Sequence, residues 1–269
     1  MHKLKYLTIS IILIIVLSLV GPSFNVSARL LAAPTQVDLG TAQSFAVLAG
    51  SGITNTGPTT ITGDVGSHPT TTQTGFGSVT LTGTNHFGDA TTQAAKTDLT
   101  AAYIDAAGQG PQIPITADLG TMSPLTPGVY NSGSSIGLTG TLILDGGGDP
   151  DAVFVFQAGS TLTAETSSSV VLINGAQACN VYWQVGSSAT LKTTSAFQGT
   201  ILALESITMN TNATLIGQAL ARNGAVTLDT NTITRPLCSP AVTTTLSAGS
   251  ITAGGTAFDS STLIGDTNN

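Results

Sequence analysis

The chain has 269 residues and a formal net charge of −7, with 41% hydrophobic residues and only 8% charged ones. An acidic and weakly charged surface argues against nucleic acid and anionic lipid as partners. A disordered chain would combine low hydrophobicity with high charge, and this composition has neither.

The first 28 residues have the pattern of a secretory signal. Lys3 and Lys5 precede an apolar run over 7–20, and residues 26–28 form a small-residue cleavage site. The alternative is an uncleaved membrane anchor, although the apolar run is short for a full span. We therefore predict a signal peptide over 1–28 and a protein that is secreted or held at the cell surface.

Short strands and turns are expected over 35–83. The apolar segment 45–49 is a strand candidate. Residues 54–58, Thr-Asn-Thr-Gly-Pro, are predicted as a turn cluster, and 69–77 as a polar loop without a period.

One segment departs from the β pattern. Residues 89–107 are rich in alanine, contain no glycine or proline, and repeat apolar side chains at steps of three and four. Asp89 stands where an N-cap belongs, and Gly108 ends the run. We predict an amphipathic helix whose buried side includes Leu99 and Tyr103, packed along the rest of the fold.

Strands are predicted to resume after the helix and to dominate the rest of the fold. The apolar segments are 153–156, 170–173, 181–183, 200–204 and 216–221. Near-continuous apolar runs are typical of strands buried on both sides, as under a helix.

A short phrase, an apolar residue beside threonines, recurs along the chain. Its last three copies begin at Thr190, Thr208 and Thr227, which are 18 and 19 residues apart. A period near twenty with one apolar position per copy indicates a β-solenoid. The apolar residues should stack inside while their neighbours point outward. The predicted inward residues are Ile61, Leu81, Leu138, Leu162, Leu191, Met209 and Leu228.

The two cysteines, Cys179 and Cys238, both follow the predicted signal and would meet an oxidising compartment. A disulfide is the simplest prediction, and it would be worth on the order of 4 kcal/mol in the chain-entropy model. The alternative is two free buried thiols that act as small apolar residues.

Three stretches, 39–69, 97–107 and 178–234, are similar to the DUF3494-type ice-binding proteins of bacteria and microbial eukaryotes. The resemblance covers roughly residues 36–238. It implies a mainly β fold, a discontinuous right-handed β-solenoid of triangular section with one long α-helix alongside. The expected domains are the signal at 1–28, the solenoid at 29–240, and a linker with an incomplete immunoglobulin-like repeat at 241–269.

The resemblance also implies binding to ice through one flat solenoid face. A loose motif, Thr-(Ala/Gly)-any-(Thr/Asn), matches residues 82–85 and 163–166, while Glu165, Lys192 and Asp229 would interrupt such a face. The candidate ice-binding residues are Thr60, Thr62, Thr80, Thr82, Thr84, Thr161, Thr163, Thr166, Thr190, Thr208 and Thr227.

The predicted function is therefore that of a secreted ice-binding, or antifreeze, protein that inhibits ice growth or recrystallisation. The alternative is a non-catalytic cell-surface adhesin or spacer module built on the same solenoid. The expected partner is the surface of an ice crystal, with no nucleic acid, no small-molecule substrate and no cofactor, and the protein is expected to be a monomer.

Few residues in the sequence are candidates for catalysis or metal binding. His68 and His86 stand alone in predicted loops, with no cysteine or second histidine at ligand spacing. The acidic segment 145–151 resembles a calcium loop, but it lacks the downstream Glu of an EF-hand and fits a turn equally well. No nucleophile motif is present, and we predict no enzymatic activity and no metal.

Overall fold

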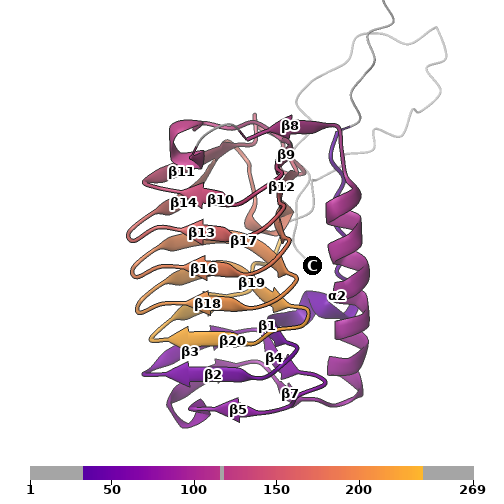
Figure 1. Ribbon diagram of the computed structural model, residues 1–269, viewed down its shortest axis with the longest axis vertical. Helices are drawn as coiled ribbons and strands as arrows, with labels where there is room; N and C mark the ends of the chain where they lie inside the picture. Colours follow the sequence, from indigo (N-terminus) through magenta and orange to yellow (C-terminus); the bar gives the residue numbers. More distant parts are fainter. Residues whose placement is uncertain (1–32, 116–117, 239–269) are drawn as a thin grey trace, which may run out of the picture.

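The structure is a computed structural model that describes residues 33–115 and 118–238. Short strands stack as the rungs of a solenoid, and a single long helix lies along one side (Figure 1). All strand pairs among the described residues are parallel. The predicted β-solenoid with one α-helix is confirmed. The predicted signal, 1–28, and the predicted tail module, 241–269, lie outside the described residues.

The strands form three faces, which we call the helix face, the threonine face and the third face. The helix face contains β1 (Phe45–Ala49), β4 (Asp64–Ser67), β7 (Asn85–Phe87), β8 (Gln112–Pro114), β9 (Gly128–Ser132), β12 (Phe154–Ala158) and β15 (Val181–Val185). The threonine face contains β10 (Ile136–Leu138), β13 (Leu162–Ala164), β16 (Ala189–Leu191), β18 (Ile207–Met209), β20 (Val226–Asp229), β2 (Ile53–Thr56) and β5 (Gln73–Thr74). The third face contains β11 (Thr141–Asp145), β14 (Ser169–Ile173), β21 (Thr232–Thr234), β3 (Thr59–Thr62) and β6 (Val79–Thr82).

Two long strands cross a corner of the solenoid. The first part of β17 (Ala196–Ala203) pairs with β14 on the third face, and its second part pairs with β15 on the helix face. The neighbouring β19 (Thr214–Ala221) pairs with β17 in register along its whole length and bends in the same way. The bend in β17 falls at Gly199, whose φ of +111° is unfavourable for other residues and whose missing Cβ would meet Trp183.

The order of coils in space differs from their order in the sequence. The first coil of the chain pairs with the last one, through β1 with β19, β2 with β20 and β3 with β21. In Figure 1 the indigo β2 accordingly lies beside the yellow β20. Helix α2 (Ala90–Gly108) then carries the chain to the opposite end, where β8 begins the remaining coils. The predicted discontinuity is confirmed.

Two local predictions in the first two coils are wrong. The expected turn at 54–58 contains most of β2, and the expected loop at 69–77 contains β5 and the start of the 3-10 helix η2 (Phe76–Ser78). These segments are polar and short, so nothing local favours a strand. They become strands because β20 on one side, and β2 itself on the other, supply backbone hydrogen-bond partners.

The interior is filled by residues that stack from coil to coil. The predicted inward residues are buried, except Leu81, which is only partly buried in the end coil. Four aromatic rings form a column, with centroid distances of 5.3 Å from Tyr130 to Phe156, 4.0 Å from Phe156 to Trp183 and 4.7 Å from Trp183 to Phe197. The Trp183 Nε1 donates a hydrogen bond to the Gln198 carbonyl at 2.9 Å, so the buried indole is satisfied.

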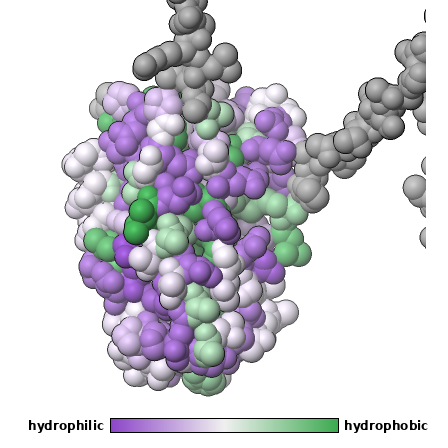
Figure 2. All heavy atoms as spheres, turned by 90° about the vertical axis from the view of Figure 1, so that its right-hand side faces the viewer, coloured by the Kyte–Doolittle hydropathy of each residue, from purple (hydrophilic) through white to green (hydrophobic). Residues whose placement is uncertain are grey.

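The helix begins and packs as predicted. Asp89 caps it, because its Oδ1 accepts a hydrogen bond from the Thr92 amide at 2.9 Å. Leu99 is fully buried, whereas Tyr103 is only partly buried against the same cluster. Figure 2 views the molecule from the helix side, which is mostly hydrophilic or neutral with small separate hydrophobic groups. The apolar side of the helix is thus turned toward the solenoid.

Three further 3-10 helices complete the described elements: η1 (Gly40–Ser44), η3 (Leu119–Thr121) and η4 (Ala178–Asn180). The prediction that the apolar strands are buried on both sides holds for β12, β15 and the second halves of β17 and β19, over which α2 or η1 packs. It is wrong for β14, where Val171 and Ile173 are exposed because no helix covers the third face.

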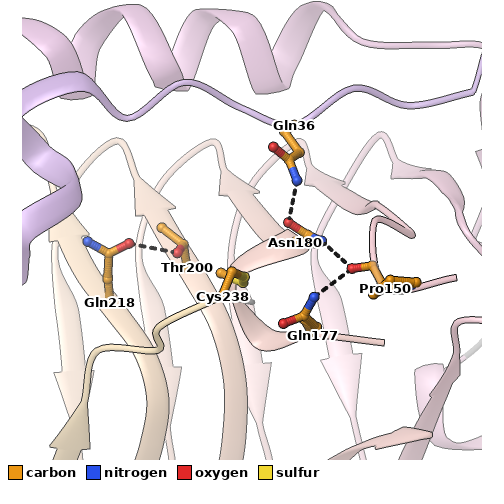
Figure 3. The surroundings of a disulfide bond; sticks show 8 residues. Gln36, Pro150, Gln177, Asn180, Thr200, Gln218 and Cys238 are labelled. Atoms are coloured by element: carbon orange, nitrogen blue, oxygen red, sulfur yellow. Dashed lines mark hydrogen bonds between the residues drawn. A yellow bond between two sulfur atoms is a disulfide. The ribbon is translucent and has the colours of Figure 1, made fainter. Parts of the chain in front are cut away.

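Cys179 and Cys238 are bonded, with their Cα atoms 6.0 Å apart. The bond joins the segment after β21 to η4, in the middle of the solenoid. Figure 3 shows the side chain of Asn180, the residue after Cys179. It accepts a hydrogen bond from the side-chain amide of Gln36 and donates one to the Pro150 carbonyl. The disulfide and these bonds tie together segments that are far apart in sequence.

Replacing Leu99 by Asp should lower the free energy of unfolding by several kcal/mol, because it places a carboxylate in a fully buried apolar position. Ile104 lies on the same helix with 61% of its surface exposed, so Ile104→Asp is the matched control and should change stability by less than about 0.5 kcal/mol. Urea denaturation measures both. Equal effects of the two substitutions would mean that the helix does not pack as described.

Removing the disulfide should lower the melting temperature. The 59-residue loop that it closes is worth on the order of 4 kcal/mol before any native-state strain is subtracted. Calorimetry of Cys179→Ala and of the Cys179→Ala/Cys238→Ala pair should give the same loss. Titration of two free thiols in the native protein would contradict the bond.

The buried Lys96 should make the free energy of unfolding depend on pH. Its Nζ donates to the Ala221 and Arg222 carbonyls, both at 2.6 Å, and burial followed by the charge of Arg222 lowers its pKa from 10.5 to about 8. Between those values the unfolded chain holds more protons, so the free energy of unfolding should rise with pH, by at most about 1.4 kcal/mol per unit. Below pH 8 both states carry the proton and this gain is lost.

Urea denaturation at about pH 7.5 and 9.5 measures this rise, with Lys96→Met as the variant that cannot titrate. The wild type should gain stability relative to the variant across that interval. Tyr130 and Tyr182, whose pKa values are raised by burial, are present in both proteins and cancel. Equal pH slopes would show that Lys96 keeps an ordinary pKa.

Candidate functional site

One column of threonines runs along the threonine face. Residues at the centre of successive strands are paired in register, from β13 through β16, β18, β20 and β2 to β5. From β13 to β2 their side chains point outward because the residues on either side of each are buried in the core, and Thr74 is paired in register with the outward Thr54. We call this set the threonine column: Thr163, Thr190, Thr208, Thr227, Thr54 and Thr74. Gly137 of β10 continues it at one end.

A second column of small residues lies beside the first. Its members come two positions earlier in each coil, and the carbonyls of all of them except Ser135, at one end, accept backbone hydrogen bonds from the neighbouring coil. They are Ser135, Thr161, Ser188, Ser206, Ala225, Gly52 and Thr72. None of these side chains is larger than threonine, so the two columns together form a surface of nearly uniform height.

The opposite edge of the face is charged and polar. Two positions after the threonine column come Thr139, Glu165, Lys192, Asn210, Asp229 and Thr56. Lys192 Nζ contacts both Glu165 carboxylate oxygens, at 2.9 and 2.7 Å. The Asp229 carboxylate accepts hydrogen bonds from the hydroxyls of Thr211 and Thr230, which hold it against the neighbouring turn.

The chain turns from this edge to the third face at a repeated corner. Ser167, Thr194, Asn212 and Thr230 occupy it in successive coils, with positive φ values of 58°, 57°, 60° and 54°. Such left-handed positions are uncommon outside glycine, and their repetition shows that each coil turns in the same way. The candidate Thr166 lies at this corner, exposed but outside the threonine column.

The structure separates the predicted ice-binding threonines into two groups. Thr163, Thr190, Thr208 and Thr227 lie together in the threonine column, and Thr161 lies beside them in register with Ser188. The remaining candidates, Thr60, Thr62, Thr80 and Thr82, lie on the third face, and Thr84 follows them between β6 and β7. The two groups do not share one face, because a coil turns a corner between the strands of the threonine face, such as β13 or β2, and those of the third face, such as β14 or β3.

The third face carries its own outward columns. One begins with Thr80, Thr60, Thr232 and Thr214 and continues with Ala196, Ser169 and Thr141. The other begins with Thr82, Thr62 and Thr234 but continues with Ile216, Gln198, Val171 and Ile143. Side chains of very different length alternate here, so the third face is less even than the threonine face.

Sequence reasoning missed Thr54 and Thr74. Thr54 belongs to the first coil and Thr74 to the second, and they join the threonine column only because β2 pairs with β20 and β5 pairs with β2. The phrase Thr54-Asn55-Thr56-Gly57 does resemble Thr227-Leu228-Asp229-Thr230, and this likeness was the available signal. It was hidden because Asn55, at the inward position, is polar. Asn55 is buried and donates to the Gly57 carbonyl at 2.9 Å.

The other candidate positions are engaged in local structure. His86 lies in β7 rather than a loop, and its Nδ1 is 2.9 Å from the Asp89 carboxylate. Asp145 accepts hydrogen bonds from the Gly147 amide and the Asn174 side chain, which lower its pKa. Within 33–115 and 118–238, no group of three or more acidic, histidine or cysteine side chains is placed to hold a metal ion.

A cavity of about 490 Å³ lies beside the disulfide, away from both threonine-bearing faces. Its walls come from the segment 36–39, from Asn180 and Tyr182, and from the segment 235–238. Burial raises the pKa of Tyr182 to about 12, so its phenol stays protonated. No helix in the described part of the chain is long and apolar enough to cross a membrane.

Comparison with known proteins identifies the family. The family model described as ice-binding-like matches residues 47–234, which is most of the chain. The chain belongs to this ice-binding family.

Its relatives agree in sequence and in structure. Over 197 residues the chain is 50% identical to an ice-binding protein of Nostoc sp. (strain HG1), and the match covers 72% of each chain. The crystal structure of an ice-binding protein from an Antarctic biological consortium matches with a TM-score of 0.74 at 50% identity, over 77% of this chain and 94% of that one. An ice-binding protein from the ascomycete Antarctomyces psychrotrophicus matches with a TM-score of 0.70 at 41% identity, over 76% of this chain and all of that one.

Proposed function

We propose that this protein binds ice through the threonine face and thereby inhibits ice growth or recrystallisation. The observation that carries the proposal is the threonine column, six threonines in register on six adjacent strands, beside a second column of small residues. Membership of the ice-binding family supports the same function.

The physical basis is a stiff array with fixed spacing. Adjacent coils lie about 4.8 Å apart, and outward residues of one strand lie about 6.7 Å apart. Threonine is β-branched and has few χ1 rotamers, so little side-chain entropy is lost on binding. Methyl groups exclude and order neighbouring water, and hydroxyls can bond to it, so many weak contacts act together over the plane.

The other two faces fit ice less well. The helix face is covered by α2 and η1, which leaves its strands no exposed surface along most of their length. The third face is open, but the side chains of Ile216 and Gln198 are longer than its threonines. A flat crystal plane would contact only the tallest of these side chains.

The same proposal includes a non-catalytic, secreted and monomeric protein. The disulfide supports an oxidising compartment, in agreement with the signal expected over 1–28. The net charge of −7 disfavours nucleic acid. The side chains that could serve as acids or bases, such as His86 and Asp145, are bound to their own local partners rather than gathered around a cavity.

Thr208→Tyr tests the choice of face. Thr208 is at the middle of the threonine column, and a tyrosine there would hold a flat ice plane away from its neighbours. The matched control is Thr214→Tyr, at the middle of the third face. Recrystallisation inhibition should fall by roughly ten-fold or more for Thr208→Tyr, the loss expected from about 1.4 kcal/mol of adsorption energy, and stay unchanged for Thr214→Tyr.

Melting temperatures should stay close to the wild-type value for both variants, because Thr214 is exposed and the half-buried Thr208 lies on the outward side of β18. Loss of activity at Thr214 alone would assign ice binding to the third face. A wild-type protein that leaves ice growth unchanged at high concentration would favour the adhesin or spacer function.

A further inference from the structure

The ion pair between Glu165 and Lys192 joins the two longest side chains on the edge of the threonine face from β10 to β2. These residues follow β13 and β16, and they are neighbours in adjacent coils because the Lys192 amide donates to the Ala164 carbonyl at 2.9 Å. About 40% of each side chain is exposed. Both side chains are much longer than threonine, and their contact at 2.7 Å holds them together over the boundary between the two coils.

The pair stands directly beside the threonine column. Thr163, Ala164 and Glu165 alternate outward, inward and outward, and the inward Ala164 is fully buried. The same holds for Thr190, Leu191 and Lys192. Each member of the pair is therefore two residues, or about 6.7 Å, from the nearest threonine of the column.

The edge from β18 to β2 has no such ridge. The next residues along the edge column are Asn210, Asp229 and Thr56, which are all shorter than Glu or Lys. The Asp229 carboxylate is drawn toward the corner by the hydroxyls of Thr211 and Thr230. From β18 to β2, the edge thus stays close to the level of the threonine column.

We infer that the Glu165–Lys192 pair limits the ice-contacting area to the part of the threonine face between β18 and β5. A flat plane that rests on Thr208, Thr227 and Thr54 would meet the charged pair before it reached Thr163. Charged groups also hold their hydration water more strongly than hydroxyls do, so an ice surface would have to displace that water. This inference rests on the proposed function of the threonine face.

The consequence is that the working area is built from both ends of the domain. Thr208 and Thr227 come from the last coils, whereas Thr54 and Thr74 come from the first two. Thr163 and Thr190, which continue the same column, contribute little in the wild type because the ion pair stands beside them.

The test is the double variant Glu165→Thr/Lys192→Thr, which lowers the ridge to the height of the column. Thermal hysteresis at equal molar concentration should rise about two-fold as the contact area lengthens. The matched control is the exchange Glu165→Lys/Lys192→Glu, which keeps both the size and the pairing and should leave hysteresis unchanged. Both variants should fold normally, because an exposed ion pair adds little to stability.

A double-mutant cycle locates the boundary. Thr163→Tyr should have little effect in the wild type but should remove the gain in the Glu165→Thr/Lys192→Thr background, whereas Thr227→Tyr should be damaging in both. If Thr163→Tyr and Thr227→Tyr are equally damaging in the wild type, or if the double Thr variant shows no gain, the inference is wrong. Loss of activity in Thr208→Tyr would still support the proposed function in that case, and an inactive wild type would overturn both.

Discussion

Every functional feature of this protein depends on the parallel, in-register pairing of successive coils. The pairing sets the same residue of each coil above its counterpart, so one inward position becomes a core column and one outward position becomes a surface column. The column of Tyr130, Phe156, Trp183 and Phe197 inside and the threonine column outside are two results of this single constraint. A slip of one residue in any coil would exchange them.

Because the order of the coils in space differs from their order in the sequence, some connecting segments need contacts beyond the strand ladder. Three segments have to be held against the solenoid without belonging to its strand ladder: η1, α2 and the chain after β21. Two buried glutamines hold the first two of these segments, η1 and α2, through hydrogen bonds. Gln157 donates to the carbonyls of Ala106 and Gln109 at the end of α2, and Gln218 donates to those of Ala42 and Phe45 around η1. These bonds satisfy carbonyls that helix ends leave without partners. The disulfide holds the third segment.

The three faces differ because their surroundings differ. Where α2 and η1 cover the strands, both sides are apolar, as in β12 and β15. Where nothing covers them, one side of each strand must suit water. The threonine face meets this need with hydroxyls of uniform size, and the third face with a mixture in which Val171 and Ile216 remain exposed. Under the proposed function, uniform size rather than polarity as such would suit the threonine face to a crystal plane.

The local sequence was enough to predict the solenoid, the helix with its Asp89 cap, and the inward position of Leu162, Leu191 and Leu228, because these depend on periodicity and on short-range capping. It was not enough to decide which threonines share a face. Thr82 and Thr163 occur in the same short motif, yet they lie on different faces because the coil turns a corner between them. Thr54 joins Thr227 only through a pairing between segments 173 residues apart, and Glu165 meets Lys192 only because adjacent coils stack in register. Such contacts are set by the tertiary fold, since no local preference of either segment favours them.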